Sequence, residues 1–192
     1  MTFQYFFFDT YLGYFLQVLP IALLVSTVYG LIRYRKKRAL PSREKVFPCV
    51  FLCYMTGLIC LVLAIDLVGV LWYLLLYRMP AGRDIRLFSG SIDLVPDFFL
   101  HLSGENLGNL LMFLPFGLLY PLSKGQTTWK KTLLAGFLSI LGIELLQPIL
   151  GRAFDINDII LNFLGILISA SLFFAVKRVY GRFTSNRAQH TP

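Results

Sequence analysis

Charged side chains are scarce in this chain of 192 residues, since only 15% are Asp, Glu, Lys or Arg while 57% are hydrophobic. A soluble domain needs a larger polar fraction to cover its core, so this composition excludes the ordinary soluble class. The mean hydropathy of +0.69 agrees with that exclusion. No soluble domain and no internal repeat is visible, and the sequence therefore indicates an integral membrane protein.

Histidine and cysteine are also few, and the common catalytic motifs are missing. The two histidines, His101 and His190, stand alone and are poor ligand candidates. There is no HExxH motif, no glycine-rich phosphate loop and no serine elbow. The three cysteines, Cys49, Cys53 and Cys60, share one apolar stretch, where we expect packing rather than a disulfide or a metal site. No motif indicates which cofactor, if any, the protein binds.

Long apolar runs are what the chain does contain, and runs of about 20 such residues predict transmembrane helices. The N-terminus has neither a basic region nor a cleavage site, so we expect the first span to be retained. The predicted fold is all-α, a polytopic membrane bundle of five helices at about 11–32, 47–67, 106–122, 132–150 and 158–176.

The net charge of +8 reflects topology rather than nucleic-acid binding. Most of the basic residues lie in 33–45, 124–131 and 177–187, between or after predicted spans. Cytoplasmic loops carry such an excess, which predicts an outside N-terminus and a cytoplasmic C-terminus. The opposite side holds only Arg78, Arg83, Arg86 and Arg152.

The chain divides into three predicted parts: 1–77, with two spans and a basic cytoplasmic loop; 78–176, with an outer loop and three spans; and 177–192, a basic cytoplasmic tail. The apolar stretch 67–77 either extends the second span or lies along the membrane interface. Over 78–99 we expect an ordered loop, because its apolar residues need a docking surface: Ile92, Leu94, Val95, Phe98 and Phe99.

Small residues mark the fourth and fifth spans. They recur on helix faces, where they permit close approach of neighbouring helices. We therefore expect the last three spans to form a compact bundle through Ala135, Ser139, Gly142, Gly165, Ser169 and Ala170.

Strongly polar residues sit in or beside the last three spans, where burial in lipid is expensive. With the N-terminus outside, the third span begins, the fourth ends and the fifth begins in the outer leaflet. Spacings of three or four residues, as in Glu144 and Gln147, put each pair on one helix face. We expect one outward-facing polar cluster, formed by Asn109, Glu144, Gln147, Arg152, Asp155, Asp158 and Asn162.

Three roles are open for this polar cluster. It could be a structural lock, in which Asp155 or Asp158 caps the fifth helix and Arg152 pairs with the carboxylates. It could bind a ligand, or a hard divalent metal ion through carboxylate oxygens. It could be catalytic, with Glu144, Asp155 or Asp158 as general acid or base and Arg152 binding a phosphate or a carboxylate. A structural lock alone does not explain why three carboxylates and only one arginine occur in the cluster, because excess charge near lipid is usually paired or bound to a ligand.

The second half of the chain resembles the VanZ-like family of bacterial membrane proteins over about 85–175. The polar cluster occupies the polar positions of that family. Two departures are Asp93, where relatives have Asn, and Phe163, where a small Thr often follows the last Asn. The resemblance is carried by SIDLVPDFF at 91–99, NLLMFLPFGLLYPL at 109–122, SILGIELLQ at 139–147 and RAFDINDIILNFLG at 152–165.

The resemblance implies a cellular setting, because the family is named for a member associated with low-level resistance to the glycopeptide teicoplanin. It implies a multi-pass protein of the bacterial plasma membrane that contacts membrane lipid and binds a lipid-linked cell-wall precursor or a lipoglycopeptide. Without a nucleophile motif we favour binding over catalysis. The alternative is an intramembrane hydrolase or transferase acting on an envelope lipid, and the lack of an inverted repeat disfavours a transporter.

Overall fold

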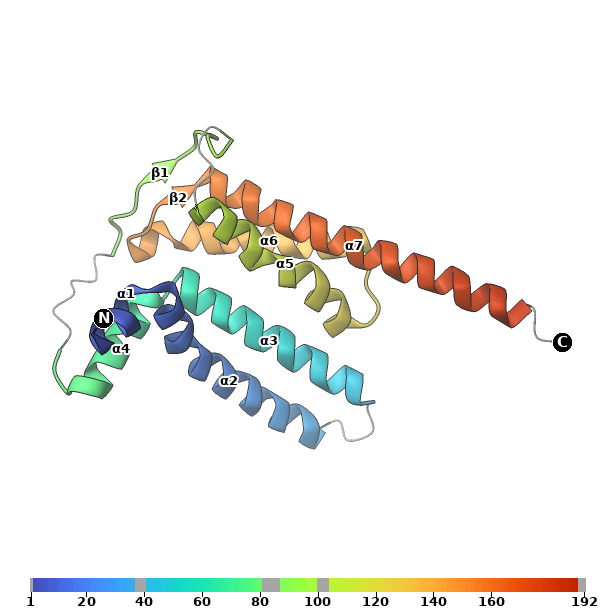
Figure 1. The fold of residues 1–192 in the computed structure, drawn as a ribbon, viewed down its shortest axis with the longest axis horizontal. Helices are drawn as coiled ribbons and strands as arrows, with labels where there is room; N and C mark the ends of the chain where they lie inside the picture. Colours follow the sequence, from blue (N-terminus) through green and yellow to red (C-terminus); the bar gives the residue numbers. More distant parts are fainter. Residues whose placement is uncertain (1, 37–40, 81–86, 100–103, 190–192) are drawn as a thin grey trace.

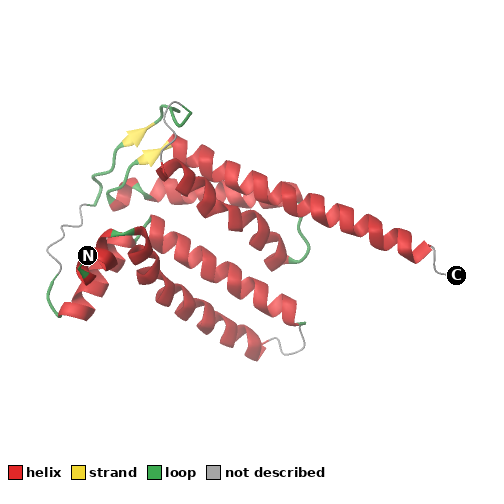
Figure 2. Ribbon diagram, in the orientation of Figure 1, coloured by secondary structure: helices red, strands yellow, loops and turns green. Residues whose placement is uncertain are grey.

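The computed structural model describes residues 2–36, 41–80, 87–99 and 104–189, and most of them are helical (Figures 1 and 2). One of the two long helices in the N-terminal half lies against the C-terminal helices, and the other lies against the first (Figure 1). The elements are α1 (Phe3–Asp9), α2 (Tyr11–Lys36), α3 (Ser42–Val62), α4 (Ile65–Tyr77), β1 (Ile92–Asp93), α5 (Gly104–Lys124), α6 (Trp129–Leu146), the 3-10 helix η1 (Pro148–Leu150), β2 (Phe154–Asp155) and α7 (Ile156–Gln189).

Four of the described helices are long and apolar enough to cross a membrane, which confirms the predicted all-α membrane bundle. The helix at the predicted third span, α5, is not among these four. Its 21 residues include Glu105, two asparagines and two prolines, which lower its hydropathy. The four segments are Tyr11–Arg35, Glu44–Val62, Trp129–Leu150 and Ile156–Tyr180.

The second predicted span ends earlier than expected. α3 stops at Val62, and the chain turns at Ala64, whose ψ of 15° lies outside the helical range. The next helix, α4, packs on the N-terminal helices, and the Trp72 indole donates a hydrogen bond of 2.9 Å to the Gln17 carbonyl. Stretch 67–77 therefore belongs to a separate helix, and the predicted boundary at 67 is wrong.

The last helix is longer than predicted. α7 does not end near 176 but continues to Gln189, so most of the predicted basic tail is helical. Residues 190–192 of that tail lie outside the described part of the chain.

Glycines let α5 and α7 approach each other closely. A Cβ on Gly117 would lie 2.6 Å from the Ala170 nitrogen, and one on Gly165 would lie 2.3 Å from the Leu110 carbonyl oxygen. Real Cβ atoms do not approach other atoms this closely, so only glycine fits at these two positions. The prediction that small residues of the fifth span serve helix packing is confirmed.

The same prediction is wrong at one position of α6. A Cβ on Gly142 would meet no atom within 4 Å. The close contact instead occurs at Gly136, where a Cβ would lie 2.6 Å from Cδ1 of Ile166 on α7. The close contact with α7 therefore involves Gly136 and not Gly142.

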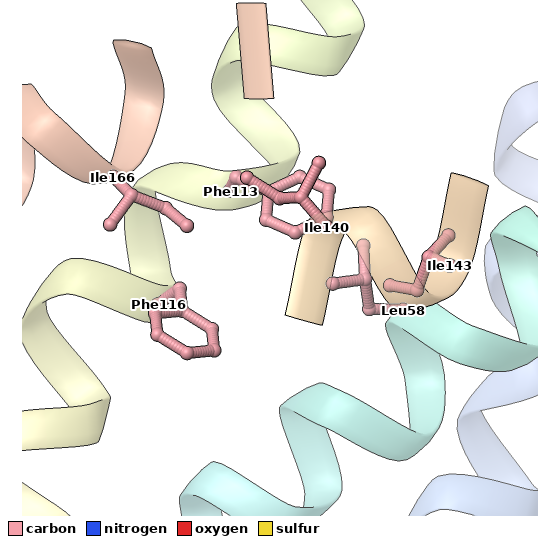
Figure 3. Close-up of a cluster of buried hydrophobic side chains, with 6 residues drawn as sticks. All are labelled: Leu58, Phe113, Phe116, Ile140, Ile143 and Ile166. Atoms are coloured by element: carbon pink, nitrogen blue, oxygen red, sulfur yellow. The ribbon is translucent and has the colours of Figure 1, made fainter. Parts of the chain in front are cut away.

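A hydrophobic core joins the two halves of the bundle (Figure 3). The Phe51 ring of α3 packs edge-on against the Phe116 ring, with centroids 5.5 Å apart. The Tyr54 hydroxyl, also on α3, donates a hydrogen bond of 2.9 Å to the Met112 carbonyl of α5. α3 is thus part of the same packed unit as the last three helices, and the core comprises Leu58, Phe113, Phe116, Ile140, Ile143 and Ile166.

Segment 87–99 crosses one end of the bundle and is held there by its backbone. The two strands β1 and β2 lie side by side (Figure 2). They pair in parallel, which sets Asp93 opposite Asp155. The Phe154 N–H adds a bond of 2.8 Å to the Ser91 carbonyl. A Cβ on Gly90 would lie only 2.0 Å from a backbone oxygen of the facing turn, so the two backbones are in close contact.

The apolar side chains of this segment do not dock as predicted. Ile92 is 70% exposed, and Leu94, Val95 and Phe99 are each about as exposed, while Phe98 is half-buried. The expected packing surface is therefore wrong for four of the five residues. Backbone hydrogen bonds hold the segment in place, and in a short strand they leave the side chains free to point away.

Candidate functional site

Three helix ends meet at the end of the bundle that carries β1 and β2 (Figure 1). α5 begins at this end (Figure 1). α6 ends and α7 begins there too, because only the short connection 147–155 separates these two helices. The helical members of the polar cluster lie within about two turns of these ends. We call this region the polar end of the bundle.

The connection turns sharply around Gln147. The Gln147 carbonyl accepts hydrogen bonds of 2.9 Å from both the Leu150 and the Arg152 N–H groups. Gly151 then takes a φ of 80°, a conformation that glycine adopts without strain. This turn reverses the chain over the end of α6 and brings the start of α7 beside it.

Glu144 is the most buried charged residue of the polar end, with 0% of its surface exposed. In the amide orientation that satisfies both neighbours, Gln147 Nε2 donates to Glu144 Oε2 at 2.8 Å and to the Ala153 carbonyl at 2.7 Å. The Asp155 backbone also hydrogen-bonds to the Glu144 carboxylate. Oε1 of Glu144 has no hydrogen-bond partner among the described residues.

Asp158 lies across from α5 and is half-buried. Its Oδ1 accepts a hydrogen bond from Nδ2 of Asn109, which joins the second turn of α5 to the first turn of α7. The sequence predicted that these two residues lie near each other at one end of the bundle, and the structure places them in direct contact.

Negative charges dominate the polar end. The acidic charge neighbours of the Glu144 carboxylate are Asp158 and Asp155, and its basic neighbour is Arg152. Asp158 has Asp155 and Glu105 as further acidic neighbours and the same basic neighbour. Since the Arg152 residue is exposed, one guanidinium does not neutralise this group of carboxylates.

Asn162 lies one helical turn beyond Asp158 on α7 and is 3% exposed. Its Oδ1 has no hydrogen-bond partner in the described parts of the chain. The structure therefore connects Asn109 with Asp158, and Glu144 with Gln147 and Asp155, and it sets Arg152 within electrostatic range of both carboxylates. No described contact connects Asn162 to the other six.

Asn157 was missed by the sequence reasoning although it is nearly fully buried. Its Oδ1 accepts from the Asp97 and Phe98 N–H groups at 3.0 and 3.2 Å, and its Nδ2 donates to the Val95 carbonyl at 3.3 Å. Asn157 thus fixes segment 87–99 to the start of α7. An asparagine between two aspartates in DIND is a signal that could have indicated it.

The described carboxylates do not form a metal site. No group of three His, Cys, Asp or Glu side chains in the described ranges is placed to hold a metal ion. His101 and His190 lie outside those ranges. What the polar end offers chemically is a set of buried oxygen acceptors in a field of negative charge.

The VanZ/LLP1 family matches this chain over residues 51–177. The match starts inside α3, upstream of the resemblance at about 85–175, and so includes the helix that completes the hydrophobic core. No curated protein and no solved structure matches the chain. The polar end lies wholly within the matched residues, and the chain is a multi-pass membrane protein that belongs to the VanZ/LLP1 family.

Proposed function

We propose that this protein resides in the bacterial plasma membrane with its polar end facing outward, where it binds a cell-envelope component. The bound component is a lipid-linked cell-wall precursor or a lipoglycopeptide, and binding contributes to resistance to antibiotics such as teicoplanin. The outward direction is supported by the basic residues at 33–36, 42–45 and 124–131, which lie at the opposite ends of α2, α3, α5 and α6.

The observation that carries this proposal is the buried Glu144 carboxylate. A structural lock is expected to satisfy its buried polar atoms, because each unpartnered one costs about 1–3 kcal/mol, and more when charged. Glu144 Oε1 has no partner in the described residues, and two further carboxylates repel this group. A buried acceptor without a partner therefore supports a binding site, in which a ligand donates the missing hydrogen bond to Glu144.

The test is teicoplanin resistance in a susceptible bacterial host that expresses the protein. Glu144→Gln keeps the side-chain shape but removes the charge, and it should return the minimal inhibitory concentration to that of cells without the protein. Asp66→Asn is the matched control, because Asp66 is an exposed acidic residue at the start of α4, outside the polar end. Wild-type resistance from Glu144→Gln at equal membrane abundance contradicts the proposal.

A second candidate is an intramembrane hydrolase or transferase acting on an envelope lipid. This candidate is favoured by two interacting carboxylates that differ in burial, since Glu144 is fully buried and Asp158 is half-buried. In such pairs, one carboxyl can act as the general acid and the other as the general base. Mass spectrometry of lipid extracts tests it. Expression of the wild type should change the lipid profile and Glu144→Gln should not, whereas identical profiles from both argue against catalysis.

A further inference from the structure

Two buried side-chain donors at the polar end are engaged by residues of the polar end itself. Nδ2 of Asn109 donates to Asp158, and Nε2 of Gln147 donates to Glu144 and to the Ala153 carbonyl. The groups without a partner are acceptors: Oε1 of Glu144 and Oδ1 of Asn162. A ligand that completes this site must therefore bring hydrogen-bond donors.

Both acceptors are more than nine-tenths buried. Asn162 follows Asp158 by four residues on α7, so the two side chains project from one helix face. Asp158 in turn is a charge neighbour of Glu144 across the α6 and α7 ends. Asp158 is thus related to both open acceptors, since it shares a helix face with Asn162 and is a charge neighbour of Glu144.

The charge distribution at the polar end also indicates which charge the ligand should carry. Glu105 is exposed, Asp155 and Asp158 are half-buried, and Glu144 is fully buried. Asp158 is a charge neighbour of the other three carboxylates. Among the described residues, Glu144 and Asp158 each have at least two acidic charge neighbours, whereas the basic neighbour of both is Arg152. A phosphate or carboxylate would be repelled here, whereas a cation would be attracted.

We propose that the polar end binds a primary ammonium group, whose three N–H donors are bound by Glu144, Asp158 and Asn162. This inference rests on the proposed function and names the chemistry of its ligand. An ammonium group has three N–H donors and no acceptor, so it can complete the hydrogen bonds of the open acceptors. Its positive charge is attracted by the carboxylates that Arg152 does not neutralise. A divalent metal ion matches less well, because no described group of three ligands is formed.

The amine could belong to a lipid headgroup or to a soluble amino sugar, and two arms of one experiment separate these sources. In the first arm, full-length protein in phosphatidylglycerol nanodiscs is given phosphatidylethanolamine or its N-acetylated form, and retained lipid is measured by native mass spectrometry. In the second arm, the full-length protein in nanodiscs that contain only phosphatidylglycerol is titrated with glucosamine or N-acetylglucosamine. The shift in the Tm of the protein is measured.

We expect the free amine to bind on the order of tenfold more tightly than its acetylated form in one arm, because acetylation removes the charge and donors. The arm that responds identifies the source. Glu144→Gln and Asp158→Asn should each remove the preference, while Asp66→Asn keeps it. Equal binding of both forms to the wild type in both arms overturns the inference, as does a preference that survives both site variants.

Failure of this inference is separable from failure of the proposed function. An amine preference that requires Glu144, without any effect of Glu144→Gln on teicoplanin resistance, leaves the ligand chemistry standing and removes the resistance role. Resistance that requires Glu144, without discrimination between free and acetylated amines, removes the ligand chemistry alone.

Discussion

The side-chain amide of Asn109 on α5 donates a hydrogen bond to the carboxylate of Asp158 on α7. The bond joins residues 49 positions apart and ties two helices that begin at the same end of the bundle. Because the acceptor is charged and half-buried, this bond is both a structural contact and a restraint on the carboxylate that the proposed site needs.

Removing this bond should destabilise the protein. Asn109→Ala leaves Asp158 without its donor, and we expect a loss of about 1–3 kcal/mol in the free energy of unfolding, measured by thermal unfolding in detergent. A double-mutant cycle with Asp158→Ala isolates the pair. A coupling energy indistinguishable from zero shows that the bond does not contribute.

Asn157 should control the order of segment 87–99. Asn157→Ala removes the acceptor of the Asp97 and Phe98 N–H groups, each bond contributing about 1 kcal/mol, so their amide exchange should rise roughly fivefold or more. Hydrogen exchange of peptides covering 87–99 measures this effect. Asn157→Asp keeps the acceptor and should give a smaller increase, and unchanged exchange in Asn157→Ala means that β1 and β2 hold the segment alone.

Two glycines should respond in opposite ways to the same substitution. Gly117→Ala places a Cβ 2.6 Å from the Ala170 backbone nitrogen, so α5 and α7 must separate at a cost of about 1–3 kcal/mol. Gly142→Ala meets no atom within 4 Å and should be neutral or stabilising by up to about 1 kcal/mol, because alanine favours helix. Thermal unfolding of the two variants compares them directly, and equal Tm values contradict the close packing at Gly117.

The orientation in the membrane is testable by cysteine labelling. In a background where Cys49, Cys53 and Cys60 are replaced by alanine, Asp93→Cys should react with a membrane-impermeant maleimide in intact cells. Lys130→Cys, at the opposite end of the bundle, should react only after the cells are permeabilised. Both positions are exposed in the structure, so burial does not explain a lack of reaction. The reverse labelling pattern contradicts the outward-facing polar end.

Helices could be predicted from the sequence because apolar runs and periodicity are local properties. The helical nature of 106–122 and 158–176 followed from such runs, as did the proximity of Asn109 to Asp158. Helix ends were less predictable. The break at Ala64 contains no proline or glycine, and it depends on α4 packing against α1 and α2.

The sequence alone determined the class of this protein and its bundle of apolar helices, because composition and hydrophobic patterning are properties of the chain itself. Only the tertiary structure decided that Glu144 is fully buried with one oxygen unpartnered, that Asn157 holds segment 87–99, and that Arg152 stays exposed. These features come from contacts between residues far apart in sequence, where packing selects which polar atoms are paired and which stay open for a ligand.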